Sequence, residues 1–425
     1  MRQFVDAVDV VGSGGSELEK KQQEQWAASG GRYIGVNGKD EDSPSNNDDG
    51  NTDIQLFYYF VESERKPEED PLAANIVFPD TPVYTGFSYS KSSPNLYVGD
   101  KESSKSIYEF VVKWLIGHPK FKSNPLYIGG DSYAAKKGSS QGSFIQLSLF
   151  ISDIETRKYP FLRLEGYLLG NPVADRQLET NAGVPYAYGM GLLSYELFES
   201  MKENCKGSYM NFDLDNANCL KDRQKYQECI RNISVAHITE DRYCGDIGPK
   251  HEEPIDNRRS LSAVAEVVAS SESVLPIPRY RDYNQNLLSG YWANDNHVQE
   301  ALHVKKETIK KWVRCSFDVP YKEDILSSVE YHQNISTKLG YRALIYSGDH
   351  DFMVPHVSTE AWIRSLNLSI TEDWRPWFLD DQFSGYTRTY SSGLTYATGA
   401  GHTTPEYRPK ESYAMFERWI SHAHL

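Results

Sequence analysis

The stretch Tyr127-Ile128-Gly129-Gly130-Asp131-Ser132-Tyr133-Ala134 decides how this chain is interpreted. Residues 125–128 form an apolar run typical of the end of a strand, and two glycines follow it. Glycine allows a turn so sharp that the hydroxyl of Ser132 would stand clear above a sheet, as in a nucleophile elbow. Gly, Asp and Ser also dominate ordinary turns, so an ordinary turn is the alternative for the motif taken alone.

Two later loops supply the partners that a serine nucleophile needs. Residues 342–348 predict a strand that breaks into Asp349-His350-Asp351, and residues 395–402 predict a short strand and a loop that ends at His402. The chain order Ser, Asp, His is that of α/β-hydrolases. Each loop follows a strand, where open α/β sheets place their ligands. A solvated turn or an ordinary loop histidine explains each site alone, but three such loops in this order favour a catalytic set.

The remaining pattern predicts an α/β-hydrolase fold with a central, mostly parallel sheet and a helical insertion. We expect a hairpin from 31–36 and 54–61, a helix over 103–117 capped by Ser103 or Ser104, and a strand over 164–169. Further helices are expected at 144–154, 298–302, 308–313 and 413–420. The predicted organisation is a polar segment (1–53), the first part of the core (54–175), the insertion with an exposed linker at about 250–276 (176–290), and the second part of the core (291–425).

Composition limits the function classes. A chain of 425 residues can bury a large core, and its net charge of −14 argues against a nucleic-acid partner. No apolar run approaches the ~20 residues that span a bilayer, so no membrane partner is expected. We expect neither cofactor nor metal, since the clustered cysteines contain no Cys-x-x-Cys pair. A small-molecule ester or peptide substrate fits this composition, and the oligomeric state is left open.

The cysteines and sequons favour an oxidising compartment. Of five cysteines, four fall in one stretch: Cys205, Cys219, Cys229 and Cys244. Three N-glycosylation sequons begin at Asn232, Asn334 and Asn367. The first residues form no apolar signal-peptide core. That leaves three alternatives: a mature fragment, a start that is missing, or a cytosolic protein with reduced cysteines.

On these motifs the sequence resembles the serine carboxypeptidase family, and within it the plant serine carboxypeptidase-like acyltransferases. The matching stretches are 56–60, 82–90, 127–133, 170–172, 312–315, 346–351 and 401–409. The similarity extends from residue 33 to the C-terminus. It implies a secreted or vacuolar protein with disulfides, and a hydrolase or acyltransferase activity.

The resemblance also implies roles for single residues. Ser132 resembles the nucleophile, His402 the general base, and Asp351 the acid that orients it. The N–H of Tyr133 corresponds to half of an oxyanion hole. Asp131 takes the place of a glutamate that binds the substrate carboxylate in the peptidases and is often aspartate in the acyltransferases. The shorter acid favours acyl transfer from a glucose ester, through an acyl-enzyme, over carboxypeptidase-type hydrolysis.

The chain departs from the family pattern in two places. The family's Trp-Leu-x-Gly-Gly-Pro-Gly-Cys-Ser segment, which supplies the second oxyanion N–H, has no counterpart near residues 72–75. After the nucleophile, Ala135 stands where the family has glycine. Two alternatives to a fully active enzyme follow: an impaired or inactive relative acting as a binding protein, or an incomplete sequence of an active enzyme.

The same segment bears on the cysteines. The resemblance implies that the cysteine of this segment forms a disulfide with Cys315. Because the segment has no counterpart here, Cys315 would be left unpaired. The resemblance implies the pairs Cys205–Cys219 and Cys229–Cys244 within the insertion.

Overall fold

A computed structural model gives the fold of most of the chain. It describes residues 32–36, 53–63, 75–93, 95–132, 162–210, 215–240, 281–309, 311–314, 319–335 and 341–425. The predicted helix at 144–154 and the predicted linker at 250–276 lie outside these residues, as do Tyr133, Ala135, Cys244 and Cys315.

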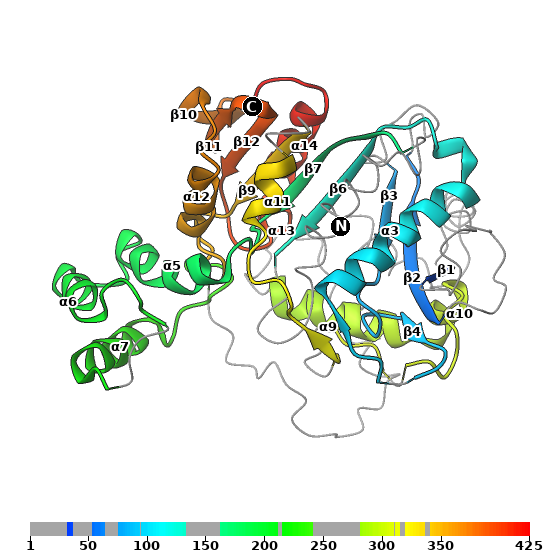
Figure 1. Ribbon diagram of the computed structural model, residues 1–425, viewed down its shortest axis with the longest axis horizontal. Coiled ribbons are helices and arrows are strands. Elements are labelled where there is room, and N and C mark those ends of the chain that lie inside the picture. Colours follow the sequence, from blue (N-terminus) through cyan, green and yellow to red (C-terminus); the bar gives the residue numbers. More distant parts are fainter. Residues whose placement is uncertain are drawn as a thin grey trace, which may run out of the picture.

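The central sheet is mostly parallel, as predicted (Figure 1). Its strands lie in the order β10 (Ile370–Leu379), β11 (Gln382–Tyr390), β12 (Leu394–Thr398), β9 (Arg342–Ser347), β7 (Leu164–Gly170) and β6 (Leu126–Asp131). The neighbours from β12 to β6 pair in parallel, whereas β10 and β11 extend the sheet as an antiparallel hairpin. The strands β6, β7, β9 and β12 confirm the α/β architecture.

A second, antiparallel sheet contains the predicted hairpin. It comprises β1 (Arg32–Val36), β2 (Ile54–Val61), β3 (Ile76–Pro79) and β4 (Tyr89–Ser90). The β1–β2 pairing confirms the hairpin. Among the described strands, β3 and β6 each end their sheet and do not pair with each other. One hydrophobic core nevertheless joins side chains of both sheets, such as Leu56 and Tyr167.

Helix α3 (Asp100–Gly117) contributes much of this core through Phe110 and Trp114. It begins before the predicted start, so the prediction that Ser103 or Ser104 caps it was wrong, and both serines are buried within the helix. The first turn is satisfied from elsewhere. Asp324, which follows the short strand pair β5 (Val98–Gly99) and β8 (Tyr321–Lys322), accepts a hydrogen bond from the Asp100 N–H at 2.9 Å.

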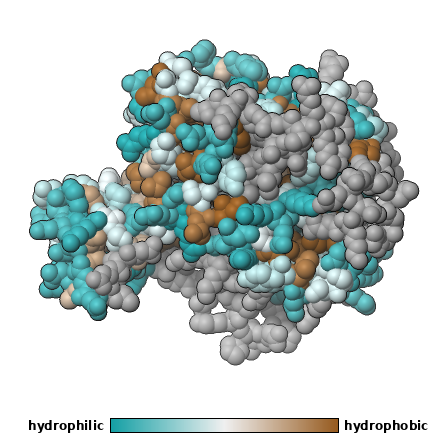
Figure 2. All heavy atoms as spheres, viewed as in Figure 1, coloured by the Kyte–Doolittle hydropathy of each residue, from teal (hydrophilic) through white to brown (hydrophobic). Residues whose placement is uncertain are grey.

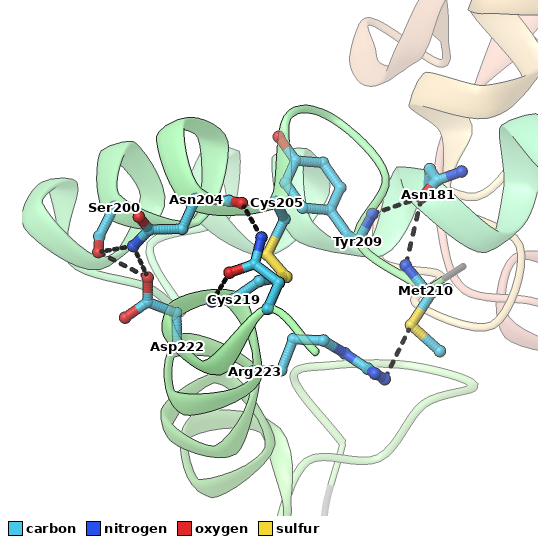
Figure 3. Close-up of a disulfide and its surroundings, with 10 residues drawn as sticks. Asn181, Ser200, Asn204, Cys205, Tyr209, Met210, Cys219, Asp222 and Arg223 are labelled. Atoms are coloured by element: carbon cyan, nitrogen blue, oxygen red, sulfur yellow. Dashed lines mark hydrogen bonds between the residues drawn. A yellow bond between two sulfur atoms is a disulfide. The ribbon is translucent and has the colours of Figure 1, made fainter. Parts of the chain in front are cut away.

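Three helices project from the central sheet with a small core of their own (Figure 1): α5 (Arg176–Gly189), α6 (Tyr195–Cys205) and α7 (Ala217–Ile230). Their outer face carries mainly hydrophilic side chains in the view of Figure 2. The Cys205–Cys219 disulfide joins the end of α6 to α7, with an S–S distance of 1.97 Å (Figure 3). Cys229 is exposed and forms no disulfide with another described cysteine, and the predicted Cys229–Cys244 pair stays a prediction. Its expected partner lies beyond the described residues.

The other helices are α9 (Arg281–Asn294), α10 (Asn296–Ala301), α11 (Val329–Asn334), α12 (His356–Ser365), α13 (Thr404–Tyr407) and α14 (Pro409–Ile420), with 3-10 turns at Pro119–Phe121 and Ser391–Gly393. Helices α10 and α14 confirm two predictions. The predicted helix at 308–313 was wrong, because the Asn294 side chain takes both backbone hydrogen bonds of Trp312. Among the described helices, none is both long and apolar enough to cross a bilayer.

Candidate active site

The carboxyl ends of the four parallel strands bring the predicted residues to one edge of the sheet. Ser132 follows β6, Asn171 follows β7, Asp351 follows β9 and His402 follows β12. Parallel strands end at the same edge, which is where open α/β sheets bind ligands. Residues separated by up to 270 positions along the chain therefore meet at a single site.

Ser132 occupies a strained turn at the end of β6. Its φ angle is +59°, in the left-handed region that non-glycine residues seldom adopt. The Ser132 N–H donates to the Gly170 carbonyl at 2.8 Å, which fixes the turn against β7. Backbone strain of this kind concentrates at functional sites. The turn is the one expected of a nucleophile elbow. Tyr133, the predicted oxyanion donor, lies outside the described residues.

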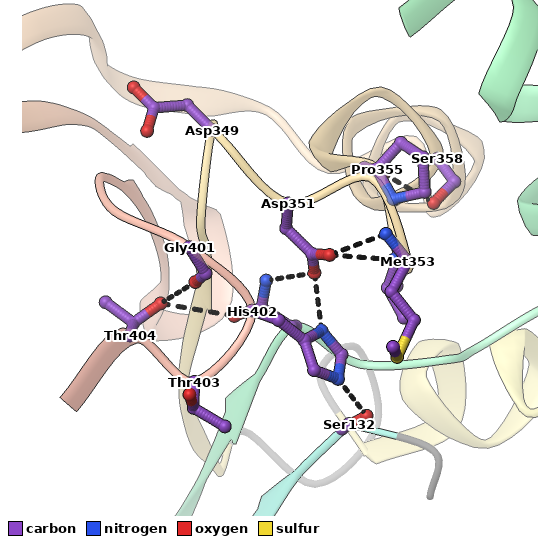
Figure 4. A network of polar contacts seen from close by, with 12 residues as sticks. Ser132, Asp349, Asp351, Met353, Pro355, Ser358, Gly401, His402, Thr403 and Thr404 are labelled. Atoms are coloured by element: carbon purple, nitrogen blue, oxygen red, sulfur yellow. Dashed lines mark hydrogen bonds and ion pairs between the residues drawn. The ribbon is translucent and has the colours of Figure 1, made fainter. Parts of the chain in front are cut away.

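A chain of hydrogen bonds links the three predicted residues (Figure 4). The distance from Ser132 Oγ to His402 Nε2 is 2.5 Å, and His402 Nδ1 lies 2.6 Å from Asp351 Oδ2. With Nδ1 donating to the carboxylate, Nε2 is left to accept from the serine hydroxyl. This arrangement can move a proton from the serine to the imidazole.

Asp351 is fully buried and accepts hydrogen bonds at both carboxylate oxygens. The N–H groups of Met353 and Val354 donate to Oδ1 at 2.7 and 3.2 Å. Oδ2 accepts from His402 and from Asn171 Nδ2, each at 2.6 Å. The other candidate acid, Asp349, points away from His402 (Figure 4). The structure therefore assigns the contact with His402 to Asp351.

Asn171 is a site residue that sequence reasoning did not assign. It is buried, its side chain bridges Asp351 and Thr404, and its N–H donates to Tyr346 of β9. Its φ of +41° turns the chain sharply after β7. The Gly170-Asn171-Pro172 sequence at a strand end was the available signal, since asparagine tolerates left-handed backbone at turns.

We expect Asn171→Ala to lower kcat about 10- to 100-fold, because a hydrogen bond to a charged group is worth about 1.5–3 kcal/mol. The loss would free Asp351 Oδ2 from one of its two donors. Steady-state kinetics measures the change in kcat, and thermal unfolding of the same sample measures the change in stability. Asn181→Ala is the matched control: Asn181 accepts from the Tyr209 N–H in the projecting helices and should change stability alone. Equal kcat for the two variants would contradict the prediction.

The charge state of His402 depends on its neighbours. Burial lowers the pKa of the imidazole, but the hydrogen bond and charge of Asp351, with the charge of Asp131, raise the pKa above its ordinary value. A base must be deprotonated to act, so activity is expected to fall as the pH drops through this raised pKa.

Asp131 precedes the serine and lies against β7 and β9. Part of the residue is open to solvent, but a Cβ added at Gly170 would come within 2.3 Å of Asp131 Oδ1 and 2.5 Å of Tyr346 Cε2. Glycine is therefore required where β7 passes the carboxyl group. Desolvation there raises the pKa of the Asp131 carboxyl to about 7, against the lowering effect of His402. The group can thus be protonated near neutral pH and then donate a hydrogen bond.

Comparison with known proteins decides the family. The model of the serine carboxypeptidase family matches residues 72–422. The chain belongs to the serine carboxypeptidase family. Serine carboxypeptidase-like 7 of Arabidopsis thaliana is 40% identical over 441 aligned positions, covering 92% of this chain and 89% of the relative. Serine carboxypeptidase-like 19 from the same plant is 41% identical, covering 87% and 88%.

A solved structure supports the fold of this serine carboxypeptidase family member. Kex1(delta)p of Saccharomyces cerevisiae, described as a prohormone-processing carboxypeptidase, superposes with a TM-score of 0.62 at 16% identity, covering 93% of this chain and 92% of the other. At that identity the likeness concerns the fold. The alignment with serine carboxypeptidase-like 7 has 441 positions, and 92% of 425 residues is about 391, so about 50 positions are filled only in the relative.

The three sequons of this family member occupy different settings. Asn232 and Asn367 are exposed, whereas Asn334 is half-buried at the last residue of α11. Glycosylation needs an accessible asparagine in a surface loop. Asn232 and Asn367 are therefore the better candidates for modification.

Proposed function

We propose that this protein catalyses acyl transfer by a Ser132–His402–Asp351 triad. The observation that carries the proposal is the continuous hydrogen-bonded chain from Ser132 Oγ through His402 to buried Asp351. The serine hydroxyl would attack the substrate carbonyl while His402 Nε2 takes its proton. The protonated imidazole would then give this proton to the leaving group, and the serine ester would form the acyl-enzyme.

The second half of the reaction returns the enzyme to its starting state. Water or an acceptor alcohol gives a proton to His402 Nε2 and attacks the acyl carbon. The serine oxygen then leaves and recovers the proton. Asp351 holds Nδ1–H and stabilises the imidazolium without accepting its proton. The Tyr133 N–H is proposed as one oxyanion donor, on the strength of its position after the nucleophile.

Two acyl donors are consistent with this chemistry, and Asp131 bears on the choice. We favour a glucose ester as donor and an alcohol as acceptor, since aspartate is one methylene shorter than the glutamate of the peptidases. Carboxypeptidase-type hydrolysis is the second candidate. Its support is the raised pKa of about 7 at Asp131, because a protonated carboxyl can donate to a peptide's terminal carboxylate.

A fluorophosphonate probe tests the triad directly. The folded wild-type protein is expected to be labelled at Ser132, and Ser132→Ala should remove the label. Mass spectrometry of the labelled peptide locates the site. If protein that unfolds cooperatively is not labelled, the proposed enzymatic function is wrong. The alternative of an inactive relative that acts as a binding protein would then be favoured.

The pH dependence of KM separates the two donors. For a blocked dipeptide, we expect KM to rise about tenfold per pH unit above about 7, as Asp131 ionises and repels the terminal carboxylate. For a phenolic glucose ester, which has no such carboxylate, KM should stay level over that range. Asp131→Asn should remove the slope for the dipeptide. If the dipeptide is turned over faster than the glucose ester and its KM rises with pH in this way, peptide hydrolysis is the activity.

The disulfide and the sequons bear on the cellular location of the protein. We propose a secreted or vacuolar location, supported by the Cys205–Cys219 disulfide and the exposed sequon residues Asn232 and Asn367. We also propose the domain division stated above, with α5–α7 inside the inserted region 176–290.

A further inference from the structure

The segment Val235–Ile238, which we call the strap, follows α7 along the chain. It runs beside the loop that carries Asp351 and the loop that carries His402. The Val235 carbonyl accepts from the Phe352 N–H at 2.9 Å, and the Ile238 N–H donates to the His350 carbonyl at 3.0 Å. The strap is therefore bonded to the residues on both sides of Asp351. Its Ala236 carbonyl accepts from the His402 N–H itself, at 2.8 Å.

The side chain of His237 fills the space between the same two loops. It is buried, and its ring centroid lies 5.0 Å from that of His350 and 4.7 Å from that of Tyr407. Its Nδ1 lies 3.0 Å from Thr239 Oγ1 within the strap region. The ring thus contacts the acid loop on one side and the helix after the base on the other.

Gly401 shows how closely the strap approaches the base. A Cβ added there would lie 2.5 Å from His237 Cδ2 and 2.9 Å from the Ala236 carbonyl oxygen. Glycine is the one residue that avoids both contacts, because it has no Cβ. The residue next to His402 is therefore fitted against the strap.

The strap is anchored in the projecting helices. Phe352, which follows Asp351, belongs to the core of α5–α7 and stacks on Tyr186 at 5.5 Å. The Tyr186 hydroxyl donates to the Asp349 carbonyl at 2.8 Å, and Ile238 packs against the same core. The projecting helices are in this way joined to the acid loop by side chains as well as by the strap.

We propose that the strap is a positioning element for the triad, with His237 as its main positioning residue; this rests on the proposed function. The strap fixes the separation of the acid and base loops and so keeps His402 Nδ1 within bonding distance of Asp351 Oδ2. Misplacement of a catalytic group by about 1 Å can cost about 10²-fold in rate. His237 touches no reacting atom and acts through the placement of Asp351 and His402.

The test compares His237→Ala with His237→Phe, which keeps a ring between the two loops. With a p-nitrophenyl acyl ester, we expect His237→Ala to lower kcat about 10²-fold with KM within about threefold, and His237→Phe to recover most of the loss. His118→Ala is the matched control. The His118 ring stacks on Trp114 at 4.3 Å, remote from the triad, so this variant should lose stability without losing kcat.

A second readout does not depend on turnover. The proton between His402 Nδ1 and Asp351 should give a strongly deshielded NMR signal in wild type, His237→Phe and His118→Ala, and no such signal in His237→Ala. Should His237→Ala fail to fold, Gly401→Ala serves in its place with the same two readouts. Where both single variants fold, the double variant should lose less kcat than the product of the two single fold-changes, because the introduced Cβ and the His237 ring compete for one space.

The outcomes separate this inference from the proposed function. If His237→Ala has the kcat and the NMR signal of the wild type, the positioning role of the strap is wrong, while the proposed triad is unaffected. A wild-type protein without turnover whose signal disappears in His237→Ala would overturn the function and keep the strap. No deshielded signal in the wild type would overturn the positioning role itself.

Discussion

Asp351→Asn is expected to lower kcat about 10⁴-fold while the protein remains folded. Two backbone N–H groups, of Met353 and Val354, donate to Asp351 Oδ1. The asparagine carbonyl oxygen is expected to stay at that position, because the two backbone N–H groups are fixed. The new NH₂ group then faces His402 Nδ1 and also the Asn171 amide, whose Nδ2 loses its acceptor. The imidazole then has to accept at Nδ1 and carry its proton on Nε2. In that tautomer it cannot accept the proton of Ser132.

The control for this experiment is Asp349→Asn. Asp349 lies two residues away in the same loop, and its carboxylate is turned from His402 (Figure 4). We expect its kcat to stay within about threefold of wild type. Kinetics and the rate of fluorophosphonate labelling should be measured on both variants at equal folded concentration. A larger loss in Asp349→Asn than in Asp351→Asn would move the orienting role to Asp349.

Restoring the absent glycine-rich segment is expected to raise kcat about 10²- to 10³-fold, the usual worth of one oxyanion donor. The insertion would carry the family's Trp-Leu-x-Gly-Gly-Pro-Gly-Cys-Ser segment between Leu72 and Asn75. Among the described strands, β3 and β6 each end their sheet and do not pair with each other, and we expect an added strand to bond at one of these ends.

A Gly/Ser insertion of equal length at the same place is the control for chain length. The segment also brings a cysteine, which we expect to pair with Cys315, as peptide mapping without reduction would detect. Restored protein that forms this disulfide and reacts no faster than the original would contradict an oxyanion defect. Ser132→Ala in the restored protein should remain inactive.

Local pattern was enough to predict the elements with strong signals. The β1–β2 hairpin, β7, β9 and α14 follow from periodicity and from glycine or proline punctuation. The β10–β11 hairpin went unpredicted, although Asp380 and Asp381 adopt φ angles of +50° and +57° as a two-residue hairpin turn requires. An Asp-Asp pair between aromatic runs was the available signal.

Predictions failed where a distant residue supplies what local sequence does not. Helix α3 begins at Asp100, where Glu102 accepts from the Gly99 N–H and Asp324, more than two hundred residues away, accepts from the Asp100 N–H. Trp312 is held out of a helix by Asn294. In both cases one tertiary hydrogen bond changes the balance between nearly equal local conformations, and no periodicity records it.

The sequence by itself determined which residues are candidates for the proposed chemistry: a serine after Gly-Gly-Asp, followed by acid and histidine loops in the order of α/β-hydrolases. The proposed nucleophile, base and acid can be predicted from sequence because each role needs a particular residue type at a strand end. Which acid faces His402, the bond from Asn171 and the strap at Val235–Ile238 were decided by the tertiary structure. These features are backbone and side-chain contacts between distant segments, and they exist after the parallel strands have brought those segments to one edge.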